Sequence, residues 1–305
     1  MHPAISVIFF TVMSGAGFGL MFLIGLGMPM AQSGVGAFFT AALAGGLAVA
    51  GLVSSTFHLG HPERAIKAFS QWRSSWLSRE GCLAVVTLML FGIYTLLWMF
   101  YGSRPMLLGL VISALCIATV FATAMIYAQL KTVPNWHSNL TPLCYLAFSL
   151  ASGLALASVV GSAGKVFGLP APTLTVFALA LAWVTKTIWW KRADMVGFSD
   201  TGSDTGTATG LGHLGKVKLL GKPHSGENYL TKEMVHQIGR KHASKLRMIS
   251  YLLGAVVPLI LCTLALLVSM PAIPMALAAI SLIAGLFAER WLFFAEAKHA
   301  VSLYY

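Results

Sequence analysis

Long apolar runs alternate with polar connectors along the whole chain. Eight windows of about 20 residues have the length that a helix needs to cross roughly 30 Å of hydrocarbon. They cover residues 5–27, 34–57, 80–101, 105–130, 140–164, 170–190, 248–270 and 273–297. Backbone groups in lipid must be hydrogen-bonded internally, and windows this continuously apolar exclude the alternating pattern of a barrel. The pattern therefore predicts an all-α, polytopic membrane protein with eight transmembrane helices, in a single domain over residues 1–305.

The composition agrees with this pattern. Hydrophobic residues make up 57% of the chain and charged residues 10%, which excludes a soluble domain. Gly15 and Gly19 have GxxxG spacing in the first window, which favours helix packing over a nucleotide loop. The four cysteines lie inside predicted spans and form no CxxC: Cys82, Cys116, Cys144 and Cys262. We interpret them as buried apolar residues and expect no iron–sulfur cluster or zinc in this protein.

The connector HLGHPERAIKAFSQWRSSWLSRE, residues 58–80, concentrates ionisable groups in a chain that is poor in charge. Such groups in a membrane protein usually have a function. Quinone chemistry moves two electrons and two protons, and histidine and a desolvated carboxyl group can both exchange protons near neutral pH. We expect His58 to hydrogen-bond a quinone oxygen, Glu80 to relay protons, and Arg64 to orient the carboxylate or stabilise negative charge. Alternatively, His58 is a polar anchor and Glu80 a carboxylate favoured by a helix N-terminus.

Aromatic residues mark the membrane boundary near this connector. Ile66, Phe69, Trp72 and Trp76 share one helical face, so residues 62–77 are predicted to form a helix lying on the membrane interface. A solvated loop is the alternative. Trp136 follows the fourth span and therefore lies on the same side as His58, either near the quinone or as an ordinary belt residue.

Two further stretches carry charge. Residues 191–246 form a predicted basic loop that can bind lipid head groups or an acidic protein partner, although plain positive-inside anchoring explains the charge as well. The net charge of +11 does not indicate nucleic acid, because the basic residues flank spans without a recognition motif. Glu289 and Arg290 fall inside the last span, mark an internal face or a water-filled path, and are expected to pair with different helices.

Several motifs together resemble a known family. His58-Leu59-Gly60-x-Pro62-x-Arg64-Ala65, Leu77-Ser78-x-Glu80 and Thr132-Val133-Pro134-x-Trp136 resemble the membrane anchor subunit of dimethyl sulfoxide reductase and its relatives. The opening MHPAISVIFFTVMSGAGFGL, the long loop before the seventh span and the ending ERWLFFAEAKH are most similar to the anchor of the sulfite dehydrogenase (sulfite:quinone oxidoreductase) branch.

This resemblance carries expectations of its own. It implies eight helices in two four-helix bundles, no haem, and a quinone site (ubiquinone or menaquinone) in which His58 and Glu80 match the family's histidine and glutamate. It also implies two partners, an iron–sulfur electron-transfer subunit and a molybdopterin catalytic subunit. The chain itself would then be a non-catalytic subunit that passes electrons from sulfite to quinone. The extra basic loop and the Glu289–Arg290 pair depart from the dimethyl sulfoxide reductase type.

The distribution of basic residues predicts an orientation. The connectors after the second, fourth and sixth spans hold most of them: Arg64, Lys67, Arg73, Arg79, Lys131, Lys191 and Arg192. The opposite connectors hold only Arg104 and Lys165. The positive-inside rule then places both termini and the quinone site on the cytoplasmic side of a bacterial inner (plasma) membrane.

Other functions stay open at this point. An anchor of a dimethyl sulfoxide reductase-type complex would oxidise quinol instead. A secondary transporter would line a midplane path with charges. A b-haem anchor needs histidines paired within the bilayer, and a passive anchor would have no quinone site.

Overall fold

The chain folds into a bundle of long helices. The computed structural model describes residues 4–28, 34–57, 61–161, 165–166, 168–221 and 242–303. Within these ranges eight helices are long and apolar enough to cross a membrane. They are α1 (Ile5–Gly25), α2 (Gly34–Thr56), α3 (Trp76–Tyr101), α4 (Met106–Ala128), α5 (Leu140–Val160), α6 (Ala171–Met195), the segment α10 (Ala243–Tyr251), η3 (Leu252–Val256) and α11 (Val257–Ala265), and α12 (Ala272–Ala295). The prediction of an all-α, eight-helix membrane protein is confirmed.

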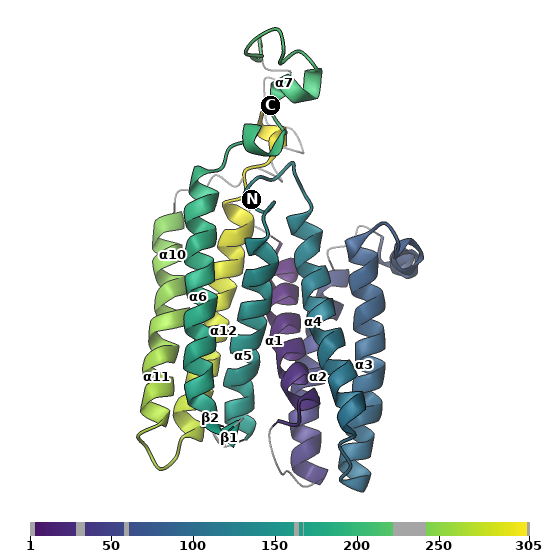
Figure 1. Cartoon of the computed structure of the whole chain (residues 1–305), viewed down its shortest axis with the longest axis vertical. Helices are drawn as coiled ribbons and strands as arrows, with labels where there is room; N and C mark the ends of the chain where they lie inside the picture. The colour runs from purple at the N-terminus through teal and green to yellow at the C-terminus, as the bar shows by residue number, and fades with distance from the viewer. Residues whose placement is uncertain are drawn as a thin grey trace.

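The helices run along the long axis of the molecule (Figure 1). Residues 196–221, with η2 (Ser199–Thr201) and the short α7 (Thr205–Thr209), project from one end, which we call the loop end. Both termini lie at this end, as an even number of spans requires (Figure 1). At the other end β1 (Lys165–Val166) pairs antiparallel with β2 (Leu169–Pro170).

Helix α1 is the centre of the packing and contacts α2, α4, α5 and α12. Small residues make this possible because they let backbones approach closely. A Cβ at Gly19 would collide with the backbone of Ser149 in α5, and one at Gly17 would collide with Ala48 in α2. Gly15, the other half of the GxxxG pair, has nothing within 4 Å of such a Cβ. The packing role predicted for the pair therefore belongs to Gly19 alone.

The remaining helices pack largely against their neighbours in sequence. Helix α3 contacts α2 and α4, and α12 contacts α5, α10 and α11. Contacts of α5 with α1 and α4 join the first four helices to the last four. The division into two four-helix bundles stays a prediction.

The seventh span contains a π-helical segment, η3, that the apolar pattern did not predict. It precedes Pro258, which has no N–H to donate to the carbonyl of Gly254 four residues earlier. The Nε1–H of Trp183 in α6 donates to that carbonyl instead, at 2.7 Å. The hydroxyl of Ser281 in α12 donates to the neighbouring carbonyl of Leu253, also at 2.7 Å. Side chains from two other helices thus satisfy the backbone that proline disrupts.

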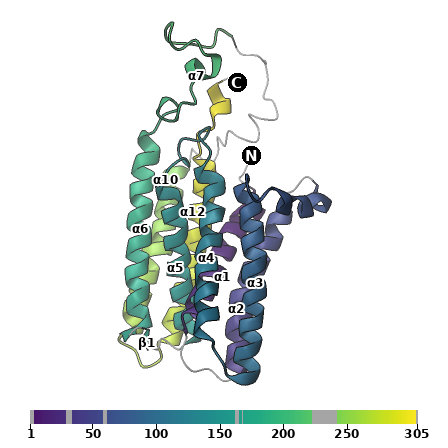
Figure 2. The same cartoon turned by 45° about the vertical axis from the view of Figure 1, so that its right-hand side comes forward.

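The connector between α2 and α3 carries η1 (Pro62–Gln71), a 3₁₀ helix beside the loop end of α3 (Figure 1, Figure 2). Three residues per turn align Ile66, Phe69 and Trp72 on one face, and all three are exposed, Ile66 to 80%. The predicted helix over 62–77 is therefore present but ends at Gln71. A new helix, α3, begins at Trp76, because the hydroxyl of Ser75 caps it by accepting from the N–H of Ser78.

The basic loop is shorter than its predicted bounds. Residues 191–195 belong to α6 and residues 243–246 to α10, so the connector between the two helices runs over 196–242. Residues 222–241 of this connector lie outside the described residues.

Candidate functional site

Glu80 lies inside the bundle rather than at a helix terminus. It is the fifth residue of α3, is only 4% exposed, and accepts a hydrogen bond on Oε1 from the hydroxyl of Thr123 in α4, at 2.5 Å. Ser75 caps α3, and Glu80 follows directly after the first turn, so an interaction with the helix N-terminus alone does not account for the burial of Glu80. A carboxyl group buried among apolar helices at this depth indicates a function.

Two of the predicted site residues are beyond what the structure describes. His58 lies outside the described residues, and so does the side chain of Arg64, whose backbone belongs to η1. The backbone returns from η1 to Glu80 within a few residues, through Arg79. The Arg79 guanidinium donates to the carbonyls of Trp72 and Arg73, at 3.0 and 2.7 Å, and lies 4.4 Å from the ring centre of Trp76. These contacts fix the start of α3 and with it the depth of Glu80.

Trp136 lies in the connector between α4 and α5, at the loop end. Its Nε1–H donates to the carbonyl of Phe293 in α12, at 2.8 Å, and its ring stacks on that of Phe293, with centroids 5.3 Å apart. Tyr127 of α4 meets Trp136 edge to face at 5.3 Å. Trp136 is therefore more than a belt residue, because it ties a connector to α12.

Two tyrosines lie between Trp136 and Glu80. Tyr127 and Tyr145 stack with centroids 6.1 Å apart, and both are close enough to Glu80 for electrostatic interaction. Trp136 and Glu80 thus share Tyr127 as a neighbour. Neither tyrosine was singled out from the sequence, because aromatic residues are common in membrane helices and these two stand in ordinary apolar runs.

The second polar group of the interior is a cluster of charges, Lys186, Glu289 and Arg290, which we call the charge cluster. The ammonium group of Lys186 lies 2.5 Å from Glu289 Oε1, and Arg290 Nε lies 3.2 Å from Glu289 Oε2. All three are buried, Lys186 to 1% exposure. One carboxylate therefore faces two cations, and the group carries a net charge of one positive unit when all three are ionised.

Aromatic rings surround the two cations. The Lys186 ammonium lies 3.8 Å from the ring centre of Trp189, and the Arg290 guanidinium lies 3.8 Å from that of Tyr145. Ring faces attract cations, most strongly where water is excluded. The rings thereby offset part of the cost of burying the uncompensated charge.

The expectation that Glu289 and Arg290 pair with different helices is half wrong. Glu289 pairs across to Lys186 of α6, but Arg290 has its ion pair with Glu289 itself and reaches α5 through its contacts with the rings of Tyr145 and Phe148. A long arginine side chain is able to fold back on its neighbour, which a rule for helix faces does not foresee. Lys186 was missed, although a lone lysine within an apolar run is a recognisable signal.

A third ionic group lies at the loop end of the same helices. Arg247 of α10 donates with two nitrogens to the carboxylate of Asp194, at 2.9 and 2.7 Å, and with Nε to Glu296 Oε1, at 2.9 Å. Arg247 is 27% exposed, so this group meets solvent. Glu296 follows Glu289 by seven residues, two helical turns, and therefore lies on the same face of the helix.

Within the described part of the protein, no three His, Cys, Asp or Glu side chains lie close enough to hold a metal ion. The described interior instead offers a carboxyl group, hydroxyls and fixed charges. These groups can hold, orient and move protons.

Comparison with known proteins gives one family and two relatives. Residues 1–295 match the model of the DMSO reductase anchor subunit (DmsC). The sequence is 33% identical to a sulfite dehydrogenase subunit of Allochromatium vinosum, over 100% of this protein and 99% of that one. It is 30% identical to a component of the anaerobic dimethyl sulfoxide reductase of Escherichia coli, over 45% of this protein and 50% of that one. No solved structure matches the sequence.

Proposed function

The chain belongs to the family of DMSO reductase anchor subunits, and we propose that it is the quinone-reactive anchor of a sulfite-oxidising complex. In this proposal electrons pass from sulfite, through a molybdopterin catalytic subunit and an iron–sulfur subunit, to a quinone in the membrane. The reacting metal centres belong to the partner subunits. The protein described here supplies the membrane anchor, the quinone site and the proton transfer groups.

One observation supports the sulfite branch most directly. The similarity to the sulfite dehydrogenase subunit extends over the full length of both proteins, whereas the similarity to the dimethyl sulfoxide reductase component covers about half of each. A relative that aligns over the full length of both proteins is the better guide to the complex in which the protein assembles. The second candidate is an anchor that oxidises quinol for a dimethyl sulfoxide reductase-type enzyme, which the family match favours equally.

The quinone site that we propose lies between η1, α3 and the loop end of α2. A bound quinone takes up two protons for each pair of electrons that it receives. We assign the supply of these protons to Glu80, whose carboxyl group is buried and accepts a hydrogen bond from Thr123. We assign the hydrogen bond to a quinone oxygen to His58, and the orientation of the Glu80 carboxylate to Arg64. Trp136 contributes through Tyr127, which it contacts.

The docking surface in this proposal is the loop end. Residues 199–221 project from the bundle there and expose large apolar side chains, among them Leu214 at 76% and Leu220 at 105%. The connectors beneath are held together by side chains: Arg192 donates to the carbonyls of Pro134 and His137, at 3.1 and 2.7 Å. A rigid platform with an apolar projection suits the iron–sulfur subunit. The basic residues of this end also assign it to the cytoplasm.

The test separates quinone chemistry from sulfite chemistry. In the purified complex, His58→Ala and Glu80→Gln are assayed with sulfite and either a short-chain quinone or ferricyanide. Loss of a proton-transfer group costs roughly 100- to 10,000-fold. We expect quinone-linked turnover to fall toward that range, while ferricyanide-linked turnover stays at the wild-type rate because the partner subunits are unchanged.

Tyr101→Phe is the control, since Tyr101 is exposed at the last residue of α3, at the end of the bundle away from both the proposed quinone site and the docking surface. Unchanged quinone kinetics in both His58→Ala and Glu80→Gln would refute the assignment of the quinone site. Absence of sulfite-dependent reduction of either acceptor, together with quinol-dependent reduction of dimethyl sulfoxide, would favour the second candidate function.

A further inference from the structure

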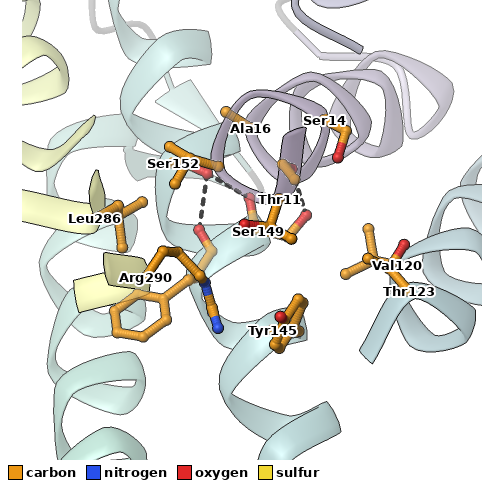
Figure 3. A pocket seen from close by; sticks show the side chains of 13 residues that line it. Thr11, Ser14, Ala16, Val120, Thr123, Tyr145, Ser149, Ser152, Leu286 and Arg290 are labelled. Atoms are coloured by element: carbon orange, nitrogen blue, oxygen red, sulfur yellow. Dashed lines mark hydrogen bonds between the residues drawn. The ribbon is translucent and has the colours of Figure 1, made fainter. Parts of the chain in front are cut away.

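A small cavity lies between α1, α4, α5 and α12, and Thr123 and Arg290 are among the residues that line it (Figure 3). Its volume is about 20 Å³, and a cavity of roughly 10–15 Å³ already holds one water molecule. Its lining is rich in polar side chains: Thr123 of α4, Tyr145, Ser149 and Ser152 of α5, and Arg290 of α12. Dry cavities in proteins are apolar, so a lining of this kind indicates water.

Two lining groups have hydrogen-bonding capacity that the protein leaves unused. Tyr145 Oη and Arg290 Nη1 are buried and have no well-aligned hydrogen bond; the two side chains interact with one another, and both face this space (Figure 3). Buried polar groups are nearly always paired with protein or with ordered water. A water in the cavity would accept from Arg290 and bond to Tyr145.

The serine hydroxyls complete such a water site. Ser149 donates its proton to the carbonyl of Gly15, at 2.7 Å, and Ser152 donates to that of Phe148, at 2.8 Å. Each hydroxyl oxygen keeps a lone pair that can accept from water. Donors and acceptors therefore surround the same small volume, which suits a water molecule better than an anion.

Thr123 connects this cavity to Glu80. Its hydroxyl lies 2.5 Å from Glu80 Oε1 and 3.0 Å from the carbonyl of Thr119. The single hydroxyl proton can go to either acceptor. The hydroxyl can therefore donate to an ionised Glu80 and accept from a protonated one, as a group that passes protons must.

The charge cluster lies on the other side of the cavity. Tyr145 is within electrostatic reach of Glu80, Glu289 and Arg290 at once, and Lys186 contacts Glu289. Glu296, two turns beyond Glu289 toward the loop end, joins the solvent-facing Arg247. Titratable groups thus follow one another from the loop end, through the bundle, to Glu80.

We propose that this cavity holds a water molecule that carries protons between the charge cluster and Glu80, as the inner part of a proton path to the quinone site. The inference rests on the proposed function. When Glu80 gives a proton to a quinone oxygen, Thr123 passes its hydroxyl proton to the carboxylate and takes one from the water. The water takes one from Tyr145, and Tyr145 regains one from the Lys186–Glu289 pair, within whose electrostatic reach it lies. The pair is then reprotonated from solvent at the loop end, past Arg247 and Glu296. One proton moves, and every hydroxyl regains its own.

The test uses substitutions that remove one oxygen atom and no charge. Tyr145→Phe and Thr123→Val are introduced into the whole complex, with Thr123→Ser as the conservative variant. We expect sulfite-to-decylubiquinone turnover to fall about tenfold in the first two, below the full cost of losing a proton-transfer group because other waters replace part of the path. Thr123→Ser should restore the rate, and sulfite-to-ferricyanide turnover should not change. The solvent deuterium isotope effect on the quinone-linked rate should increase.

Matched controls distinguish the loss of the proton path from a general loss of packing. Tyr94→Phe removes a buried hydroxyl far from the cavity, in the last turns of α3, and Thr119→Val removes one a turn away from Thr123 on α4. Both controls should keep the wild-type rate. Equal rates in Tyr145→Phe, Thr123→Val and the two controls would overturn the proposal.

A structural measurement gives a second readout. An electron cryomicroscopy map of the complex should show density for water within hydrogen-bonding distance of Tyr145 Oη and Arg290 Nη1, and this density should weaken in Tyr145→Phe. An empty cavity, or a chloride ion in it, would overturn the proposal.

The variants also distinguish this proposal from the proposed function. If Glu80→Gln removes quinone-linked turnover while Tyr145→Phe and Thr123→Val do not, the proton path is refuted and the quinone site is not. If Glu80→Gln also leaves turnover unchanged, the proposed function fails with it.

Discussion

Removing different members of the charge cluster should have very unequal effects on stability. Glu289→Gln leaves two buried cations, Lys186 and Arg290, with no carboxylate between them. Breaking a buried ion pair by removing one partner costs about 3–5 kcal/mol, because the other charge stays in the interior unpaired. Glu289 contacts both cations, at 2.5 and 3.2 Å, so we expect the upper part of this range, about 4–5 kcal/mol.

Lys186→Met should be much milder. It removes a cation whose own burial is costly and leaves Glu289 paired with Arg290, which makes the cluster neutral. The losses are the contact with Glu289 and the cation–π contact with Trp189, at 3.8 Å, the latter about 0.5–2 kcal/mol. Methionine fills a similar volume. We therefore expect a change of at most about 2 kcal/mol, in either direction.

Thermal unfolding of the detergent-solubilised complex measures the difference. The two variants should differ by at least about 2 kcal/mol, so at about 2–4 °C per kcal/mol Glu289→Gln should unfold at least about 4–8 °C below Lys186→Met. The control is Lys191→Met, an exposed lysine near the end of α6, which should match the wild type. If Lys186→Met destabilised the complex as much as Glu289→Gln, the reasoning from net charge would be wrong, and the lysine–carboxylate contact would have to stabilise the fold on its own.

Three further outcomes follow from packing and topology. Gly19→Ala should destabilise the complex by about 1–3 kcal/mol or more, because its methyl group meets the backbone of α5. Gly46→Ala, with open space around it in α2, should be neutral or slightly stabilising in the same thermal assay. Trp136→Phe keeps an aromatic ring but loses the hydrogen bond to Phe293 and part of the stacked indole surface, so it should lower stability by at least about 1 kcal/mol; an unchanged unfolding temperature would contradict this. A reporter fused after Tyr305 should be active as a fluorescent protein and inactive as alkaline phosphatase, and the reverse result would overturn the cytoplasmic assignment of the loop end.

The helices could be predicted because each membrane span appears in the sequence as a long apolar window. Their ends were less predictable, since they depend on side chains at the boundary. Helix α3 begins at Trp76, before the apolar window, because Ser75 caps it and the Arg79 guanidinium donates to the carbonyls of Trp72 and Arg73 just before it. Helix α6 continues to Met195 because Arg192 finds carbonyl partners in the neighbouring connector. Charged residues that find partners at the boundary extend a helix beyond its hydrophobic length.

The partners inside the bundle could not be predicted. Glu289 and Arg290 are visible in the sequence as charges within a span, but their contact with Lys186 depends on how α6 and α12 are rotated about their axes. Thr123 gives no signal at all, because threonine in a membrane helix usually bonds to its own backbone, as Thr123 also does. Spacing rules describe one helix at a time, and both contacts join two helices.

The π-helical segment η3 changes which residues of the seventh span face the neighbouring helices. A π turn accommodates one residue more than an α turn, and one residue corresponds to about 100° of rotation around an α-helix. The faces of α10 and α11 are therefore out of phase with a single uninterrupted helix over 243–265. A helical wheel drawn through the whole span assigns lipid-facing positions of α11 to the protein interior. Cysteine-accessibility scans and sequence alignments across Pro258 should allow for a one-residue offset at Leu252–Val256.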